Sequence, residues 1–215
     1  MTVFDTLSEY GVVPVIAIDD ADQALPLADA LIEGGLPVAE ITFRTDAARD
    51  VIAQIAASRP QMIVGAGTVL TEAQADAAQA AGAKFALSPG IDGAVLAHAQ
   101  RIGLPFAPGI MTPSELQLAL RHDCPMVKFF PAMPAGGPNM LKNIAAPYAH
   151  TGIGFNPTGG VTLDNLPDWL ALPQVRAVGG TWIATRADIA AGNWDQITRN
   201  AAEAVARIKD IRSKA

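Results

Sequence analysis

The chain has 215 residues, of which 50% are hydrophobic and 17% are charged, and its formal net charge is −6. This composition can bury a sizeable core, and the acidic balance argues against nonspecific binding to nucleic acid or to an anionic membrane. The single cysteine, Cys124, excludes a framework of disulfides within the chain and favours a reducing compartment.

Short apolar runs alternate along the chain with longer, alanine-rich amphipathic stretches. The runs predict strands over 12–18, 37–43, 62–67, 84–88, 104–109, 126–130, 152–157 and 175–180. N-cap residues predict helices between them, at Asp20, Asp46, Thr71 and Thr112, the last with Glu115 in a capping-box pattern. A final helix is expected over about 193–212, and another before the first strand.

The repeated strand–helix units predict the fold. Eight such units in a chain of this length indicate a (β/α)8 TIM barrel with an N-terminal helix, formed by a single domain over residues 1–215. A doubly wound open sheet is the alternative, but it usually carries a glycine-rich turn after its first strand, and this chain continues instead with AIDDADQAL. In a barrel, functional groups gather at the carboxyl ends of the strands.

The expected strand over 37–43 carries polar side chains on one face. Because side chains alternate along a strand, Val38, Glu40, Thr42 and Arg44 share a face, and the other face is apolar. Both faces of a parallel sheet are normally buried, so polar groups there are costly unless they have a use. They indicate a functional site, with a Glu–Arg pair that serves only the fold as the alternative.

Lys128 interrupts the apolar strand over 126–130. Because side chains alternate along a strand, Lys128 is expected to point into the barrel, as Glu40 does. Apolar surroundings and a nearby cation favour the neutral form of an amine. A neutral amine can attack a carbonyl and form a Schiff base, and a neighbouring carboxylate can transfer the protons. The alternative is a lysine paired with Glu40 for structure alone.

Two glycine pairs end the last two expected strands, in NPTGGVT (156–162) and VGGTW (178–182). Consecutive backbone N–H groups near glycine can hold an anion, and these loops are the usual phosphate site of a TIM barrel. The sequence therefore predicts a phosphate site there, with Thr181 as a further hydroxyl donor. Ordinary turns are the alternative.

Other features are less specific. Thr68 and Pro89 end expected strands and would line the mouth of the barrel. The histidines lack metal-ligand spacing, so no metal is expected, and Cys124 is expected to be inert. The start of the sequence has no basic secretory region, and no apolar run approaches the ~18 residues of a membrane span. We therefore expect a cytoplasmic protein that binds neither membrane nor nucleic acid.

The ordered motifs PVAEITFRT, VGAGTVL, SPG, VKFFPA, PTGG and GGTW resemble those of the 2-keto-3-deoxy-6-phosphogluconate (KDPG) aldolases, whose family also includes enzymes that cleave 4-hydroxy-2-oxoglutarate (KHG). The resemblance runs from about Pro14 to the final helix. It implies a class I aldolase on a (β/α)8 barrel, usually a homotrimer, which needs no cofactor. The implied reaction cleaves a keto acid phosphate to pyruvate and D-glyceraldehyde 3-phosphate in the Entner–Doudoroff route.

The resemblance also implies roles for individual residues. It makes Lys128 the Schiff-base lysine, Glu40 the proton-shuttling carboxylate and Arg44 the partner of the pyruvate carboxylate. The remaining substrate-binding residues that it implies are Thr68, Pro89, Phe130, Thr158, Gly159, Gly160, Gly180 and Thr181.

The chain departs from the family pattern at three positions. Asn156 stands where cysteine is common, Thr181 where serine is common, and Met133 where glutamate often follows the FFPA motif. Arg44 favours the gluconate enzyme over the related phosphogalactonate aldolase.

Two further alternatives for the function stay open: a phosphate-binding barrel isomerase or synthase without a covalent step, and a non-enzymatic sensor of sugar phosphates.

Overall fold

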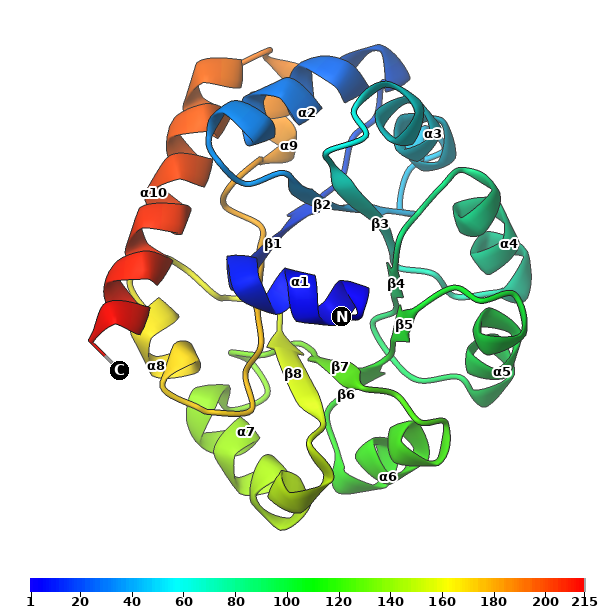
Figure 1. Ribbon diagram of the computed structural model, residues 1–215, viewed down its shortest axis with the longest axis vertical. Coiled ribbons are helices and arrows are strands. Elements are labelled where there is room, and N and C mark those ends of the chain that lie inside the picture. The colour runs from blue at the N-terminus through cyan, green and yellow to red at the C-terminus, as the bar shows by residue number, and fades with distance from the viewer. Residues whose placement is uncertain (215) are drawn as a thin grey trace.

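In the computed structural model, which describes residues 1–214, helices surround an inner set of strands (Figure 1). The strands are β1 Val12–Ile16, β2 Val38–Thr42, β3 Ile63–Gly67, β4 Ala86–Leu87, β5 Phe106–Ala107, β6 Gly109–Ile110, β7 Met126–Phe129, β8 Gly154–Pro157 and β9 Val178–Gly180. The α-helices are α1 Val3–Tyr10, α2 Ala24–Glu33, α3 Ala48–Ser58, α4 Glu72–Ala80, α5 Gly93–Arg101, α6 Pro113–Arg121, α7 Gly137–Ala145, α8 Leu166–Leu170, α9 Arg186–Ala190 and α10 Trp194–Ser213. Two 3₁₀ turns, η1 Ala21–Gln23 and η2 Ala146–Thr151, complete the described elements.

All the paired strands are parallel, and they form a curled sheet. Six strands follow the order β5-β4-β3-β2-β1-β9, and three more follow the order β6-β7-β8. Isolated bridges from Phe155 to Val175 and from Thr158 to Gly179 connect β8 with the β9 region. The expected α/β fold with parallel strands is confirmed, whereas closure into a complete eight-stranded barrel stays a prediction.

The strand expected over 104–109 is divided into β5 and β6. Pro108 separates them, and proline has no N–H to donate to a ladder. β5 pairs with β4, whereas Gly109 of β6 pairs with Lys128 of β7. The continuous chain through Pro108 therefore joins the two parts of the sheet, and the Pro108 carbonyl still accepts a hydrogen bond from the Lys128 N–H at 2.8 Å.

Helix α1 confirms the expected N-terminal helix. Its capping box joins Thr2 and Asp5, and its apolar side chains Phe4 and Leu7 are buried. The chain passes from α1 through Gly11 directly into β1, so α1 lies at the end where the strands begin, and in Figure 1 it crosses the centre of the ring. The opposite end, where the strands finish, is the end that carries the polar residues.

The local signals for helices were correct in most places. Thr71 caps α4, and Thr112 and Glu115 form the expected capping box of α6. The expectation for Asp46 is wrong, because α3 begins at Ala48 after Ala47, without a side-chain cap. Asp20 caps the 3₁₀ turn η1, which precedes α2.

Candidate active site

Two buried charged side chains meet inside the curled sheet. Lys128 projects from β7 and Glu40 from β2, and the lysine Nζ lies 3.0 Å from Glu40 Oε1. Only 5% of Lys128 and 0% of Glu40 is exposed. The alternation along the two strands predicted that both side chains face inward, and the structure shows that they are in contact.

The pair is only partly satisfied by hydrogen bonds. Among the described residues, Glu40 Oε2 is buried without a hydrogen-bond partner. Removing two charges from water costs several kcal/mol per ion, and full hydrogen bonding is needed to offset that cost. A buried ion pair in which one carboxylate oxygen has no hydrogen-bond donor therefore stabilises the fold poorly, and its carboxylate can still accept a proton.

A glycine on β3 makes room for the carboxylate. Gly65 pairs with Glu40 in register, and Gly67 lies two residues further along the same face. A Cβ at Gly67 would lie only 2.2 Å from Glu40 Oε1. Gly67 therefore permits the carboxylate to reach Lys128.

Gly67→Ala is expected to displace the Glu40 carboxylate. Forcing a methyl group into a filled site destabilises by about 1–3 kcal/mol, and the loss of the Glu40–Lys128 contact should lower any activity that depends on it. Urea unfolding and a rate measurement check both effects. Gly93→Ala is the matched control, because its Cβ would have its nearest neighbour at 3.4 Å; an equal loss in both variants would contradict the account.

A polar group that sequence reasoning did not assign to the site lies next to Lys128. Asn156 of β8 pairs with Lys128 in register and is 0% exposed. Its Oδ1 accepts a hydrogen bond from the Thr158 hydroxyl at 3.0 Å, and its Nδ2 donates to the Ala177 carbonyl at 3.3 Å. The signal was present, since asparagine, like lysine, is mostly an exposed residue and is uncommon in a buried strand.

Arg44 lies just beyond the end of β2 and is exposed. Its Nε donates to the Thr42 hydroxyl at 3.1 Å, and that hydroxyl donates to the Ile16 carbonyl at 2.8 Å. The buried Thr42 hydroxyl therefore fixes the Nε end of the exposed Arg44 guanidinium, at the end where the strands finish. Within residues 1–214 the two NH₂ groups of this guanidinium have no further hydrogen bond or ion pair.

The two glycine loops are neighbours. The bridge between Thr158 and Gly179 joins the end of β8 to β9, and Gly180 is the last residue of β9. Gly159 and Gly160 have φ values of 101° and 78°, which glycine adopts without strain. Thr181 is exposed directly after β9. The two glycine loops therefore lie side by side where the strands finish, and their role in binding an anion stays a prediction.

The other predicted residues also follow strand ends. Thr68 comes directly after β3 with a left-handed φ of 57°, and Pro89 follows β4 and lines a cavity of about 290 Å³. Phe130 directly follows β7, and its ring centroid lies 5.8 Å from Lys128 Nζ. These three residues are half-buried.

Cys124 lies before β7, away from this end. Burial, with a smaller contribution from Asp123, raises the pKa of its thiol to about 11. A raised pKa keeps the thiol protonated at neutral pH, and the protonated thiol is a poor nucleophile. This agrees with the expectation that Cys124 is inert.

Cys124 is therefore expected to react slowly with iodoacetamide in the folded protein at pH 8, and quickly after unfolding in guanidinium. Intact-mass measurement over time follows the alkylation. Rapid modification of the folded protein, or loss of activity in Cys124→Ala, would show that the thiol is not inert.

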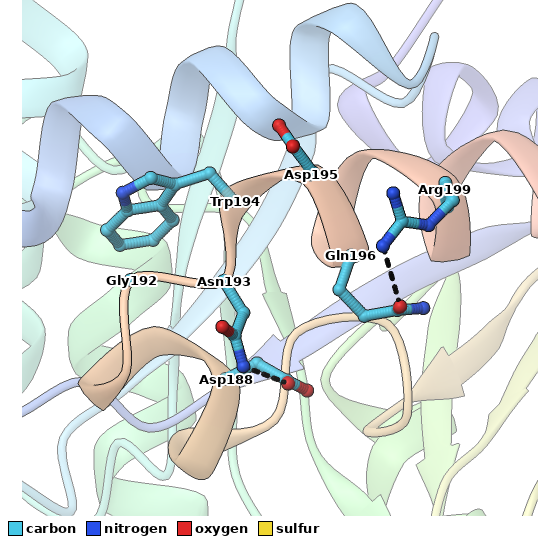
Figure 2. A pocket seen from close by; sticks show the side chains of 7 residues that line it. All are labelled: Asp188, Gly192, Asn193, Trp194, Asp195, Gln196 and Arg199. Atoms are coloured by element: carbon cyan, nitrogen blue, oxygen red, sulfur yellow. Dashed lines mark hydrogen bonds between the residues drawn. The ribbon is translucent and has the colours of Figure 1, made fainter.

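Outside the predicted site, a cavity of about 490 Å³ lies between α9 and the start of α10 (Figure 2). None of the predicted site residues lines it. The Asp188 carboxylate accepts hydrogen bonds from the Thr185 hydroxyl and the Asn193 amide. The Asp188 carboxylate is thus satisfied by residues of the same helix junction.

Two classes of feature are missing from residues 1–214. No group of three or more His, Cys, Asp or Glu side chains there is placed to hold a metal ion. Over the same residues, every helix is too short or too polar to span a bilayer.

The parallel α/β fold and the buried amine–carboxylate pair near the strand ends define a candidate Schiff-base enzyme. A family model described as "KDPG and KHG aldolase" matches residues 3–200. The chain therefore belongs to the KDPG and KHG aldolase family.

Relatives within the family are similar over nearly their whole length. The chain is 43% identical to the 2-dehydro-3-deoxy-phosphogluconate aldolase of Haemophilus influenzae, over 96% of this chain and 97% of that protein. It is also 43% identical to the KHG/KDPG aldolase of Escherichia coli K12, over 93% and 92% of the two chains.

Solved structures agree with this assignment. The KDPG aldolase of Legionella pneumophila, with pyruvate captured as a covalent carbinolamine intermediate, is 39% identical with a TM-score of 0.88, and the match covers 93% of this chain and 96% of that one. A structure described as native KDPGal is 26% identical with a TM-score of 0.84, over 94% and 96% of the two chains.

Proposed function

We propose that this protein is a class I aldolase, a lyase that cleaves 2-dehydro-3-deoxy-6-phosphogluconate to pyruvate and D-glyceraldehyde 3-phosphate. The observation that carries the proposal is the buried Lys128–Glu40 pair, 3.0 Å apart, in a chain of this family. Cleavage of 4-hydroxy-2-oxoglutarate to pyruvate and glyoxylate is a second activity, favoured by the similarity to the KHG/KDPG aldolase of Escherichia coli.

The proposed reaction begins at Lys128. Its amine attacks the C2 carbonyl of the keto acid, and loss of water gives a protonated imine. Glu40 accepts the proton of the C4 hydroxyl, directly or through a water, and the C3–C4 bond breaks. The bonding electrons move toward the imine to form an enamine, and the aldehyde product leaves. Glu40 returns a proton to C3, and hydrolysis releases pyruvate and the free lysine.

The remaining residues are proposed to hold the two ends of the substrate. Arg44 binds the carboxylate, and Thr68, Pro89 and Phe130 shape the pocket around the pyruvyl group. The phosphate is assigned to the loops that contain Gly159, Gly160, Gly180 and Thr181, while Thr158 contacts substrate beside them. The neighbouring positions of these loops and the exposed guanidinium of Arg44 support this arrangement.

A coupled assay tests the proposed reaction. Pyruvate released from synthetic 2-dehydro-3-deoxy-6-phosphogluconate is reduced by lactate dehydrogenase, and the fall in NADH absorbance gives the rate. The C4 epimer, 2-dehydro-3-deoxy-6-phosphogalactonate, serves as the matched comparison and is expected to be cleaved more slowly. Faster cleavage of the epimer would favour the galactonate enzyme, which the lower identity to the KDPGal structure disfavours.

Chelation is expected to leave the rate unchanged. The protonated imine accepts the electrons from the broken C–C bond, so the chemistry requires no metal or organic cofactor. The assay is run before and after incubation with excess EDTA followed by gel filtration. A rate that collapses after this treatment and returns on adding a divalent cation would contradict the mechanism.

The domain structure, the oligomeric state and the cellular location of the protein are also inferred. We infer a single domain over residues 1–215 in which the curled sheet closes into a (β/α)8 barrel, supported by the bridges between β8 and β9. We also infer a cytoplasmic homotrimer that acts in the Entner–Doudoroff route. Exposed apolar side chains support self-association. Leu70 follows β3, Met111 follows β6, Met133 follows β7, and Met140 lies in the next helix, α7. Light scattering measures the oligomer mass.

A further inference from the structure

The side chain of Asn156 carries an inference that rests on the proposed function and deepens it. Asn156 is fully buried and lies beside Lys128 on the adjacent strand. Thr158 follows two residues later and is also buried, so its side chain points to the same face, one step nearer the strand ends. An amide and a hydroxyl thus line the same wall as the Schiff-base lysine.

The direction of both hydrogen bonds is forced. The Ala177 carbonyl can only accept, so the amide atom 3.3 Å from it must be the NH₂ group. The amide oxygen then faces the Thr158 hydroxyl at 3.0 Å, and because this oxygen can only accept, the hydroxyl must donate. Asn156 therefore takes the hydroxyl proton, and the lone pairs of Thr158 Oγ1 are left to accept a hydrogen bond.

The position of the hydroxyl is fixed as well. A Cβ at Gly179 would lie 2.2 Å from Thr158 Oγ1, so the threonine side chain occupies space that glycine leaves open. The Thr158 N–H donates to the Phe129 carbonyl at 3.0 Å, and its carbonyl accepts from the Ala132 N–H at 2.8 Å. The backbone on either side of the hydroxyl is therefore tied to the segment that follows Lys128.

We propose that Asn156 is a positioning residue that fixes the Thr158 hydroxyl as the hydrogen-bond acceptor for the hydroxyl formed on the carbon that Lys128 attacks. When the amine adds, a C–N bond forms, the carbonyl π electrons move to oxygen, and this oxygen takes the proton that nitrogen loses. The resulting hydroxyl can donate to Thr158. An ionised carboxylate has no proton to donate, so an accepting threonine discriminates against it.

Pyruvate provides the test, because it has no hydroxyl of its own and gains one only when the lysine adds to it. The rate of borohydride trapping with pyruvate is measured for the wild type, Asn156→Cys, Thr158→Val and the double variant. Loss of one oriented hydrogen bond is expected to slow trapping about five- to tenfold in each single variant. The double variant should be no slower than Thr158→Val, because Asn156 acts through Thr158. Thr158→Ser, which keeps the hydroxyl, should recover most of the rate that Thr158→Val loses.

Matched controls separate this role from a structural one. Asn143→Cys changes an exposed asparagine on α7 and should leave trapping unchanged. Thermal melting monitors folding, and Asn156→Ser replaces Asn156→Cys if the latter does not fold. Unchanged trapping in the Asn156 variant, or losses that multiply in the double variant, would overturn the proposal while leaving the aldolase function intact. Absence of any adduct in the wild type would instead overturn the proposed function.

Discussion

Lys128→Gln is expected to reduce aldol cleavage by about 10⁴-fold or more, because glutamine cannot form the imine on which every later step depends. Glutamine is one bond shorter than lysine and carries no charge, but its NH₂ group remains a hydrogen-bond donor. The coupled pyruvate assay measures the residual rate. The borohydride adduct with pyruvate should be lost in the same variant.

The controls for this variant address folding and specificity. Loss of one partner from a buried ion pair costs about 3–5 kcal/mol, so circular dichroism must show that the variant is folded at the assay temperature. Lys142→Gln alters an exposed lysine on α7 and should cleave at the wild-type rate. Near-normal cleavage by folded Lys128→Gln would exclude the covalent mechanism and favour an isomerase or synthase with a non-covalent acid–base pair.

Glu40→Gln is expected to separate the two halves of the chemistry. The amide has nearly the same shape as the carboxylate but cannot take the C4 hydroxyl proton, so cleavage should fall by about 10²–10⁴-fold. The adduct between pyruvate and Lys128 should still form, because the lysine remains in place. Parallel measurement of cleavage and trapping distinguishes the loss of a proton carrier from the loss of the nucleophile.

An equal loss of trapping and cleavage would contradict the role of Glu40 as a proton carrier. If Glu40→Gln abolishes trapping and cleavage equally, Glu40 acts chiefly by holding Lys128 in position. The exposed Glu203 of α10 provides the matched control, and Glu203→Gln should leave both measurements unchanged.

Much of the fold followed from local signals. The hydroxyl of Thr112 and the carboxylate of Glu115 are three residues apart, so the start of α6 could be predicted without tertiary information. Asp46 shows the limit of such signals, because an acid before an alanine-rich segment does not determine where the first helical residue lies. The division at Pro108 depends on which strands pair on each side of it, and sequence alone does not give that pairing.

In the candidate site, too, some features could be predicted from the sequence and others depend on packing. Alternation placed Glu40 and Lys128 on inward faces, but their contact joins residues 88 positions apart and depends on how the sheet curls. The requirement for glycine at position 67 comes from an atom on β2, the neighbouring strand. The role of Asn156 depends on the Ala177 carbonyl, 21 residues away. Residue types and alternation thus predicted which groups face inward, whereas packing decided which of them touch.

The most direct test of the central claim is borohydride reduction in the presence of pyruvate, followed by peptide mass spectrometry. A stable adduct on Lys128 alone is expected. An adduct on Lys84 or Lys142 would preserve the aldolase class but contradict the site. No adduct in the folded protein would contradict the Schiff-base mechanism itself.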